Sequence, residues 1–280
     1  MSEIDGISKS KLHGLWALTN RELKKWYKAP MLFVLSIIQP IIWMGLLGKS
    51  INMGALIPTS IPGVDPKTIL QDTLGTSDYF SFMAVGMIAF TALFTTMFSG
   101  MSVVWDRRLG FLNKVLSTPV SRAAIIFSKV LSATLRSIFQ ASIIIVIAVA
   151  FGLQFGVTFT PVNILGVFAI LFLICMGLSS LFIAITIRST RIETPMAVVN
   201  LINLPLMFAS NAFFPTAYMP DWLQTIARFN PLTYTNDAVR QLLIFDMNYA
   251  QLAVDFAFVG IFAVIVATIG IVLSWRFLSK

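Results

Sequence analysis

The sequence predicts an all-α polytopic membrane protein that crosses the bilayer six times. Of the 280 residues, 57% are hydrophobic and 11% are charged, whereas a soluble domain carries about 25% charged residues. Six apolar runs recur along the chain, each close to the ~20 residues that a helix needs to cross about 30 Å of hydrocarbon. We therefore expect one transmembrane domain over residues 1–280, with a cytoplasmic interfacial arm (1–30), a six-span body (31–275) and a cytoplasmic tail (276–280).

The predicted spans are separated by both short and long gaps. They are Met31–Leu47, Phe80–Val104, Ser137–Phe155, Ile164–Ile187, Pro195–Phe214 and Phe256–Trp275. Pro40 is expected to kink the first span and Pro205 the fifth. The third helix is expected to begin earlier, near Ala123, so that Lys129 and Arg136 project below the membrane or reach its surface.

The lysines and arginines orient these spans. Sixteen of the 20 lie in the N-terminal segment, in the gaps after the second and fourth spans, or in the tail. The alternate gaps hold only Lys49, Lys67, Arg228 and Arg240. Because basic residues collect in cytoplasmic segments, we expect a multi-pass protein of the cell membrane with both termini in the cytoplasm. The same topology accounts for the net charge of +8, so this charge does not indicate nucleic-acid binding.

The N-terminal arm is predicted to form a basic amphipathic helix on the inner membrane surface. At about 100° per residue, its apolar and basic side chains fall on opposite faces. The apolar face holds Leu12, Leu15, Trp16, Leu23, Trp26 and Tyr27, and the basic face holds Arg21, Lys24, Lys25 and Lys28. Such a helix is expected to lie in the headgroup layer and to contact membrane lipid. A helix packed on a partner protein is the alternative.

Two segments on the outer side are long. Residues 48–78 contain Pro58, Pro62 and Pro66 and are expected to be loop-like, with a short helix near Thr68–Leu74. Residues 215–255 are too apolar for a solvated loop and too often interrupted for a span. We expect short amphipathic or re-entrant helices there, between the fifth and sixth spans, because backbone can leave a helix inside the membrane only where protein or water satisfies it.

The side chains argue against several classes of function. His13 is the one histidine and Cys175 the one cysteine, so neither a metal site nor a serine–histidine catalytic site is expected. The sequence has no phosphate loop of the form G-x-x-x-x-G-K-[ST]. The spans hold almost no ionisable residues, unlike those of ion-coupled transporters. We therefore expect a membrane body, not an enzyme, whose energy comes from outside the chain.

The gap after the second span is a candidate for contact with an energy-supplying partner. An apolar stripe at helical spacing is followed by Thr118-Pro119, which ends the helix, and by Ser121, which is placed to cap the next one. We expect a short cytoplasmic helix that can transmit a push to two long ones. The candidate residues are Arg107, Arg108, Gly110, Phe111, Leu112, Val115, Leu116, Thr118, Pro119 and Arg122. An ordinary amphipathic connector is the alternative.

A second candidate site lies in the outer segment, where we expect a gate. Asn230-Pro231 is a turn signal before a helix, because proline suits a first helical turn. Asp237 and Arg240 stand three residues apart and can pair on that helix. The candidate gate residues are Asn211, Pro215, Pro220, Trp222, Asn230, Pro231, Tyr234, Asp237 and Arg240. A membrane-surface helix with no substrate role is an equal alternative.

The arm, the six spans and the two segments, taken in this order, resemble the permease subunit of type-2 ABC exporters. This family includes drug-resistance exporters and exporters of polysaccharide or lipid, and the drug-exporter permeases look most similar. The strings Thr118-Pro119-Val-Ser-Arg122 and Asn230-Pro-Leu-Thr-Tyr234 carry the resemblance together with Asp237 and Arg240.

The resemblance implies a partner and a task. The segment from Arg107 to Arg122 would be a coupling helix that docks on a separate ATPase subunit, and that subunit would bind ATP and Mg, leaving no cofactor in this chain. A homodimer, or a heterodimer with a homologous permease, would sit above two ATPases. The cargo would be a drug, a lipid or a lipid-linked glycan, and it would leave along the mostly uncharged Phe80–Val104 and Pro195–Phe214.

The chain departs from the glutamate-rich pattern of this family in the coupling segment. It has Asp106, Arg108 and Asn113 where glutamate is frequent, and Phe111 where threonine is common. The ion pairs of the dock are therefore expected to differ, with a more acidic ATPase surface. Two other functions stay open: a non-transporting membrane scaffold or assembly partner of an ATPase, and a secondary transporter.

Overall fold

The computed structural model describes residues 11–50, 66–118, 120–189 and 191–278, and every regular element in these ranges is a helix. The elements are α1 (Lys11–Tyr27), α2 (Pro30–Trp43), the π-helix η1 (Met44–Lys49), α3 (Pro66–Leu74), α4 (Tyr79–Arg108), α5 (Phe111–Leu116), α6 (Arg122–Ala150), α7 (Asn163–Thr186), α8 (Glu193–Phe208), the 3-10 helix η3 (Thr216–Tyr218), α9 (Asp221–Ala227), α10 (Pro231–Leu243) and α11 (Tyr249–Leu278). The prediction of an all-helical chain is confirmed for the described residues.

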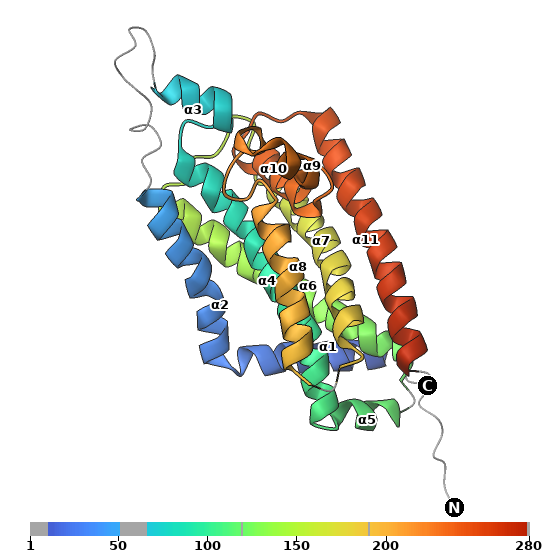
Figure 1. Cartoon of the computed structure of the whole chain (residues 1–280). Coiled ribbons are helices and arrows are strands. Elements are labelled where there is room, and N and C mark those ends of the chain that lie inside the picture. Colours follow the sequence, from blue (N-terminus) through green and yellow to red (C-terminus); the bar gives the residue numbers. More distant parts are fainter. Residues whose placement is uncertain (1–10, 51–65, 119, 190, 279–280) are drawn as a thin grey trace, which may run out of the picture.

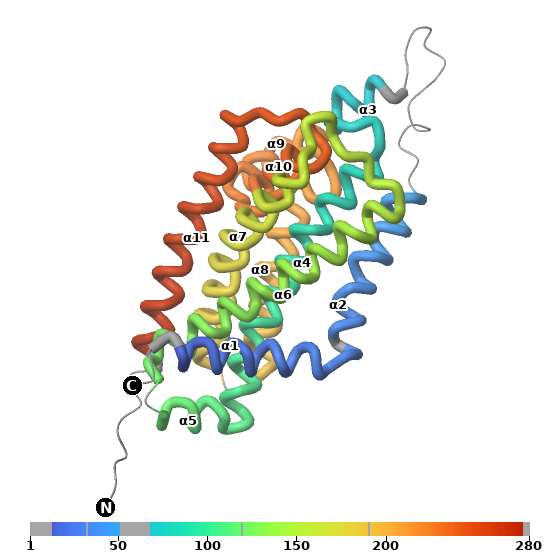
Figure 2. The backbone as a smooth tube through the Cα atoms, turned by 180° about the vertical axis from the view of Figure 1, so that it is seen from behind, coloured from blue at the N-terminus to red at the C-terminus, as the bar shows by residue number. Residues whose placement is uncertain are grey.

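Long helices run side by side and short helices close both ends of the bundle (Figure 1). α4 lies in the middle, where it packs against α6 and α7 and also touches α2, α8 and α10. α11 packs mainly on α7. α1 and α5 lie across one end, and α3, α9 and α10 lie at the other, as the reverse view also shows (Figure 2). We call these the α5 end and the α10 end.

Within the described residues, four helical stretches are long and apolar enough to cross a membrane. They are Thr68–Arg108, Arg122–Ala150, Asn163–Thr186 and Tyr249–Arg276. The apolar helix over Phe33–Lys49 is shorter, and α8 has 16 residues, about 24 Å of helix against ~30 Å of hydrocarbon. Each predicted span thus overlaps a helix, and the short helix near Thr68–Leu74 is confirmed, while the count of six crossings stays a prediction.

The third span ends before its predicted boundary at Phe155. α6 begins at Arg122, as expected, and ends at Ala150. Gly152 follows with φ 97°, in the left-handed region that commonly ends helices at glycine. The Leu153 amide then donates back to the Ala148 carbonyl at 2.9 Å. Because of this glycine turn, which the apolar run of the sequence does not reveal, α6 ends before the predicted boundary.

The fifth span also ends early, at Phe208 instead of Phe214. The side-chain amide of Asn230 donates to the carbonyls of Leu206 and Ala209 at 2.7 and 2.9 Å. These bonds satisfy carbonyls that a continuing helix would have paired. Asn230, which lies 22 positions after Phe208, therefore allows the chain to leave the helix inside the bundle.

α4 is enclosed by its neighbours, and the expectation that a cargo leaves along Phe80–Val104 stays a prediction. Nearly all of its side chains are buried, and Phe98 is its exposed large side chain within that range. Close packing depends on glycine: a Cβ added to Gly86 would lie 2.1 Å from the Ala212 carbonyl oxygen, the kind of backbone approach that small residues allow between membrane helices. α8, by contrast, presents exposed apolar side chains such as Leu201.

Candidate functional site

A two-residue turn, Leu109-Gly110, connects α4 to α5. Gly110 has φ 68°, which favours glycine, and the amides of Leu109 and Gly110 each donate to carbonyls of the last turn of α4 at 3.0 Å. At the far side, Ser121 accepts from the Ala124 amide at 3.2 Å and caps α6. The predicted short helix and the predicted cap both occur, and they hold α5 across the ends of α4 and α6.

The apolar stripe of α5 faces the chain's own core. Leu112 and Val115 are 3% and 6% exposed, and they belong to a cluster formed with residues of α4, α6 and α7. Phe111 and Leu116 are partly buried against the same cluster. Of the predicted contact residues, these four therefore hold α5 in place, and Leu112 and Val115 are not accessible to a partner.

The opposite side of this region is exposed and basic. Leu109 is 74% exposed at the tip of the turn and Trp105 is 49% exposed beside it. Arg108, Lys114 and Arg122 are also exposed. Other exposed or partly exposed residues here are Arg107, Gly110, Asn113, Ser117, Thr118 and Ser121. Pro119 lies outside the described residues. An apolar tip surrounded by cations forms the accessible surface of the α5 end.

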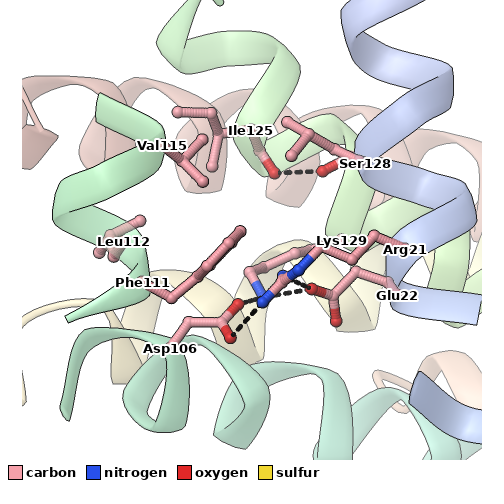
Figure 3. A pocket seen from close by; sticks show the side chains of 10 residues that line it. Arg21, Glu22, Asp106, Phe111, Leu112, Val115, Ile125, Ser128 and Lys129 are labelled. Atoms are coloured by element: carbon pink, nitrogen blue, oxygen red, sulfur yellow. Dashed lines mark hydrogen bonds and ion pairs between the residues drawn. The ribbon is translucent and has the colours of Figure 1, made fainter. Parts of the chain in front are cut away.

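A buried cluster of charges lies behind this surface (Figure 3). Glu22 of α1 and Asp106 of α4 both bind the Lys129 Nζ of α6, at 3.3 and 2.6 Å. Lys25 Nζ binds the same two carboxylates at 3.0 and 2.8 Å, and Arg21 binds them at 2.9 and 3.6 Å. We call these five residues the junction cluster, because three cations share two carboxylates across three helices.

The junction cluster is largely shielded from solvent and reaches α5. The side chains of Glu22, Asp106 and Lys129 are only 5–6% exposed, which is tolerable for charges because each is paired. The guanidinium carbon of Arg21 lies 3.1 Å from the centroid of the Phe111 ring, a cation–π contact. One contact network therefore connects α1, α4, α5 and α6.

The space at this junction is too small for a ligand. The enclosed volume is about 10 Å³, at the lower limit for a single water molecule. Its lining residues are Leu18, Arg21, Glu22, Asp106, Phe111, Leu112, Val115, Ile125, Ser128 and Lys129. The junction is thus a packed joint between helices and not a binding pocket.

The junction cluster was not predicted. Arg21 and Lys25, on the predicted basic face of the arm, bind Asp106 of α4. Trp16 and Tyr27, on the predicted apolar face, are exposed, and the position of the arm in the headgroup layer stays a prediction. α1 packs along α6, so one side of this helix belongs to the protein. The signal in the sequence was a single acidic residue within each of two basic segments.

At the α10 end, Asn230 joins two helices. It caps α10 by accepting from the Leu232 amide at 3.0 Å, as the turn signal predicts, while Pro231 occupies the first turn. The same side chain closes the end of α8 through the carbonyls of Leu206 and Ala209. One amide therefore fixes the relative position of α8 and α10.

Arg240 of α10 is buried and binds main-chain carbonyls. Its Nη2 donates to Phe82, Asn211 and Ala212 at 3.4, 2.7 and 3.3 Å, and its guanidinium lies 3.6 Å from the Phe82 ring centroid. The predicted partner Asp237 is 3.9 Å away and is bound by the Asn211 amide. Burial lowers the pKa of Arg240 to about 10, against the opposing effect of Asp237, so Arg240 stays charged at neutral pH.

The other predicted gate residues do not join this contact network. Trp222 is 66% exposed on α9. Tyr234 stacks on Phe258 of α11, with the ring centroids 3.9 Å apart, and its hydroxyl donates to the Arg228 carbonyl at 2.8 Å. Pro215 and Pro220 immediately precede η3 and α9. The structure thus brings together Asn211, Asn230, Asp237 and Arg240 around the break that follows α8.

Comparison with known proteins gives a consistent result. The profile of the family described as "ABC-2 type transporter" matches residues 13–244. The chain is 32% identical to a transport permease named ycf38 from Cyanophora paradoxa over 81% of this chain and 73% of the relative. It is 23% identical to the daunorubicin resistance ABC transporter permease protein DrrB1 of Streptomyces coeruleorubidus, over 60% of this chain and 59% of that protein. Nodulation protein J of Rhizobium leguminosarum is also 23% identical, over 81% and 80% of the two chains.

Proposed function

This chain belongs to the ABC-2 type transporter family, and from that premise we propose that it is the membrane-spanning permease subunit of an ATP-driven exporter. The ATP and Mg are bound by a separate ABC ATPase, two copies of which serve a homodimer or heterodimer of permeases. The chain crosses the plasma membrane six times, with the α5 end and both termini in the cytoplasm. The excess of lysine and arginine in the segments at that end supports this orientation.

The α5 end is the proposed dock for the ATPase. The observation that carries this proposal is the division of α5 into two sides: its apolar stripe is buried in the bundle, and its other side is exposed and basic around Leu109. A helix anchored in this way can pass an applied force to α4 and α6. The complementary ATPase surface is acidic, with a recess for Leu109, because apolar anchors seat in desolvated pockets inside a polar rim.

The cargo is a drug-like, lipid or lipid-linked amphiphile. An open groove of about 410 Å³ borders the exposed side of α2 and η1. It is lined by Leu35, Ile38, Gln39, Ile42, Trp43 and Leu46. Five apolar side chains with one amide suit a mostly apolar molecule that has a hydrogen-bonding group. The name of the relative linked to daunorubicin resistance agrees with such a cargo.

The cluster around Arg240 is the proposed outer gate. Its bonds hold the break after α8 against α4, so the outer end is closed in this conformation. Opening requires the segment at Asn211 and Ala212 to leave Arg240, or α10 to move with it.

Transport into inside-out membrane vesicles, with daunorubicin as the probe, tests this function. Vesicles that contain the chain and an ABC ATPase from its own host are expected to accumulate daunorubicin with ATP, in the presence of an ionophore. Arg108→Glu at the dock is expected to abolish this accumulation, and Arg228→Glu, an exposed residue at the α10 end, is expected to preserve it. Accumulation that collapses with the ionophore and survives ATP depletion would replace the proposal with a secondary transporter.

A further inference from the structure

The junction cluster connects α5 to a helix that is distant from it in sequence. α5 is joined by the chain to α4 and α6 alone. Arg21, Glu22 and Lys25, however, extend from α1 to Asp106, Lys129 and the Phe111 ring. A displacement of α5 therefore acts on a third helix through side-chain contacts.

The connection from α1 to α2 is stiff. Only Lys28 and Ala29 separate the two helices. The Lys28 amide donates to the Lys24 carbonyl at 3.1 Å, and the Phe33 amide donates to the Ala29 carbonyl at 3.2 Å. Trp26 of α1 packs edge-on against Phe33 of α2, with the ring centroids 5.0 Å apart. A corner that is hydrogen-bonded and packed on both sides moves as one piece, so a shift of α1 is passed to α2.

Lys129 is central to this connection. It is the cation that binds both buried carboxylates while itself buried, at 6% side-chain exposure, whereas Arg21 and Lys25 are 30% and 41% exposed. Without its charge, Glu22 and Asp106 keep the more exposed Arg21 and Lys25 but lose the buried cation that ties both carboxylates to α6. Lys129 therefore supplies the buried part of the connection between the arm and α4.

We propose that Lys129, Glu22 and Asp106 are positioning residues that couple the arm α1 to α5. The arm then acts as a second lever, which transfers the movement of α5 to α2. This inference rests on the proposed function, because it needs an ATPase that moves α5. Movement then reaches the groove on α2 by way of α1, in addition to the direct connection through α4 and α6.

Spin-label distance measurements on the complex in nanodiscs test the lever. Cys175, which is buried, is replaced by alanine, and a reference label is placed at the exposed Val264 of α11. A second label is placed at Asn113 of α5 in one sample and at Ala17 of α1 in another, both exposed positions. Distances are recorded with ADP and with Mg-ATP bound to an ATPase whose catalytic glutamate is neutralised.

The unmodified cluster is expected to give an ATP-dependent shift at both Asn113 and Ala17. Lys129→Met is expected to keep the shift at Asn113 and to lose it at Ala17, and Lys129→Arg is expected to restore both. Lys24→Met, which removes an exposed arm lysine, is the matched control and is expected to change neither. Arg21→Gln, at the more exposed edge of the cluster, is the second variant and is expected to weaken the Ala17 shift alone.

Two results would overturn the lever while leaving the dock intact. One is an Ala17 shift of unchanged size in both Lys129→Met and Arg21→Gln. The other is a fixed Ala17 distance in the unmodified chain when Asn113 moves. If Asn113 does not respond to ATP in any sample, the dock itself is wrong and the lever is overturned with it.

Discussion

The two ends of the bundle are both fixed by buried polar side chains, but with different partners. At the α5 end, side chains of three helices pair with one another through Lys129 and two carboxylates. At the α10 end, Asn230 and Arg240 bind main-chain carbonyls around one helix break. Side-chain ion pairs can re-form as helices move, whereas bonds to carbonyls define a backbone path. The difference indicates that ion pairs can exchange partners at the α5 end, whereas the α10 end opens only when bonds between Arg240 and main-chain carbonyls break.

The largest expected effect comes from removing the central cation of the joint. Lys129→Met leaves Glu22 and Asp106 with only the more exposed Arg21 and Lys25 as partners, and removing one partner of a buried ion pair costs up to about 3–5 kcal/mol. A large drop in the melting temperature of the purified chain is expected. Lys129→Arg should recover most of it, and Lys28→Met, at an exposed arm lysine, should melt like the parent. Equal melting of Lys129→Met and the parent would show that the joint contributes nothing.

Removing the guanidinium of Arg240 at the α10 end is expected to have a smaller effect. Arg240→Gln leaves three carbonyls with fewer donors, at a cost of about 2–3 kcal/mol. Because lysine cannot reproduce the planar fork of arginine, Arg240→Lys should rescue little. Hydrogen exchange should rise in residues 209–215, while Arg228→Gln, at an exposed site, leaves exchange unchanged. Unaltered exchange in Arg240→Gln would show that Arg240 does not hold the segment that follows α8.

The close approach between the backbone of α4 at Gly86 and that of Ala212 gives a prediction about packing. Gly86→Ala places a Cβ 2.1 Å from the Ala212 carbonyl oxygen, and such overpacking costs about 1–3 kcal/mol. Gly45→Ala is the matched control, because nothing lies within 4 Å of its added Cβ. A comparison of the melting temperatures separates the two. Similar values for both variants would contradict the contact between α4 and the segment after α8.

The smallest expected effect concerns the cap between α8 and α10. Asn230→Ala removes one capping bond and two bonds to carbonyls, which together cost about 1–2 kcal/mol. Its melting temperature should fall slightly below that of Asn113→Ala, an exposed asparagine on α5. If Asn230→Ala is as stable as that control, the joining of the two helices depends on Arg240 instead.

Helices and local caps could be predicted because their signals are local in the sequence. The apolar runs located α4 and α7 closely, although α11 begins at Tyr249 and not at the predicted Phe256. The caps at Ser121 and Asn230 follow from residue type and position. The early end of α8 could not be predicted in the same way. It depends on Asn230, a contact made only after the chain has folded back.

The candidate sites were predicted in position but not in their contacts. The sequence located α5 correctly, yet periodicity cannot tell whether an apolar stripe faces a partner or the chain's own core. Glu22, Asp106 and Lys129 are separated by 84 and 23 residues, so no local pattern links them. The available signal for the junction cluster was an acidic residue within a basic segment. For the α10 end it was Arg240, an arginine in a gap that holds few basic residues.

The most direct test of the dock at the α5 end is native mass spectrometry of the tagged chain, gently extracted from the membranes of its own host. We expect a complex of two permeases and two ATPase subunits, which Arg108→Glu dissociates and Arg228→Glu leaves intact. Unmodified chain that emerges without an ATPase, under conditions that preserve known ABC complexes, would contradict the dock at the α5 end and the exporter function built on it.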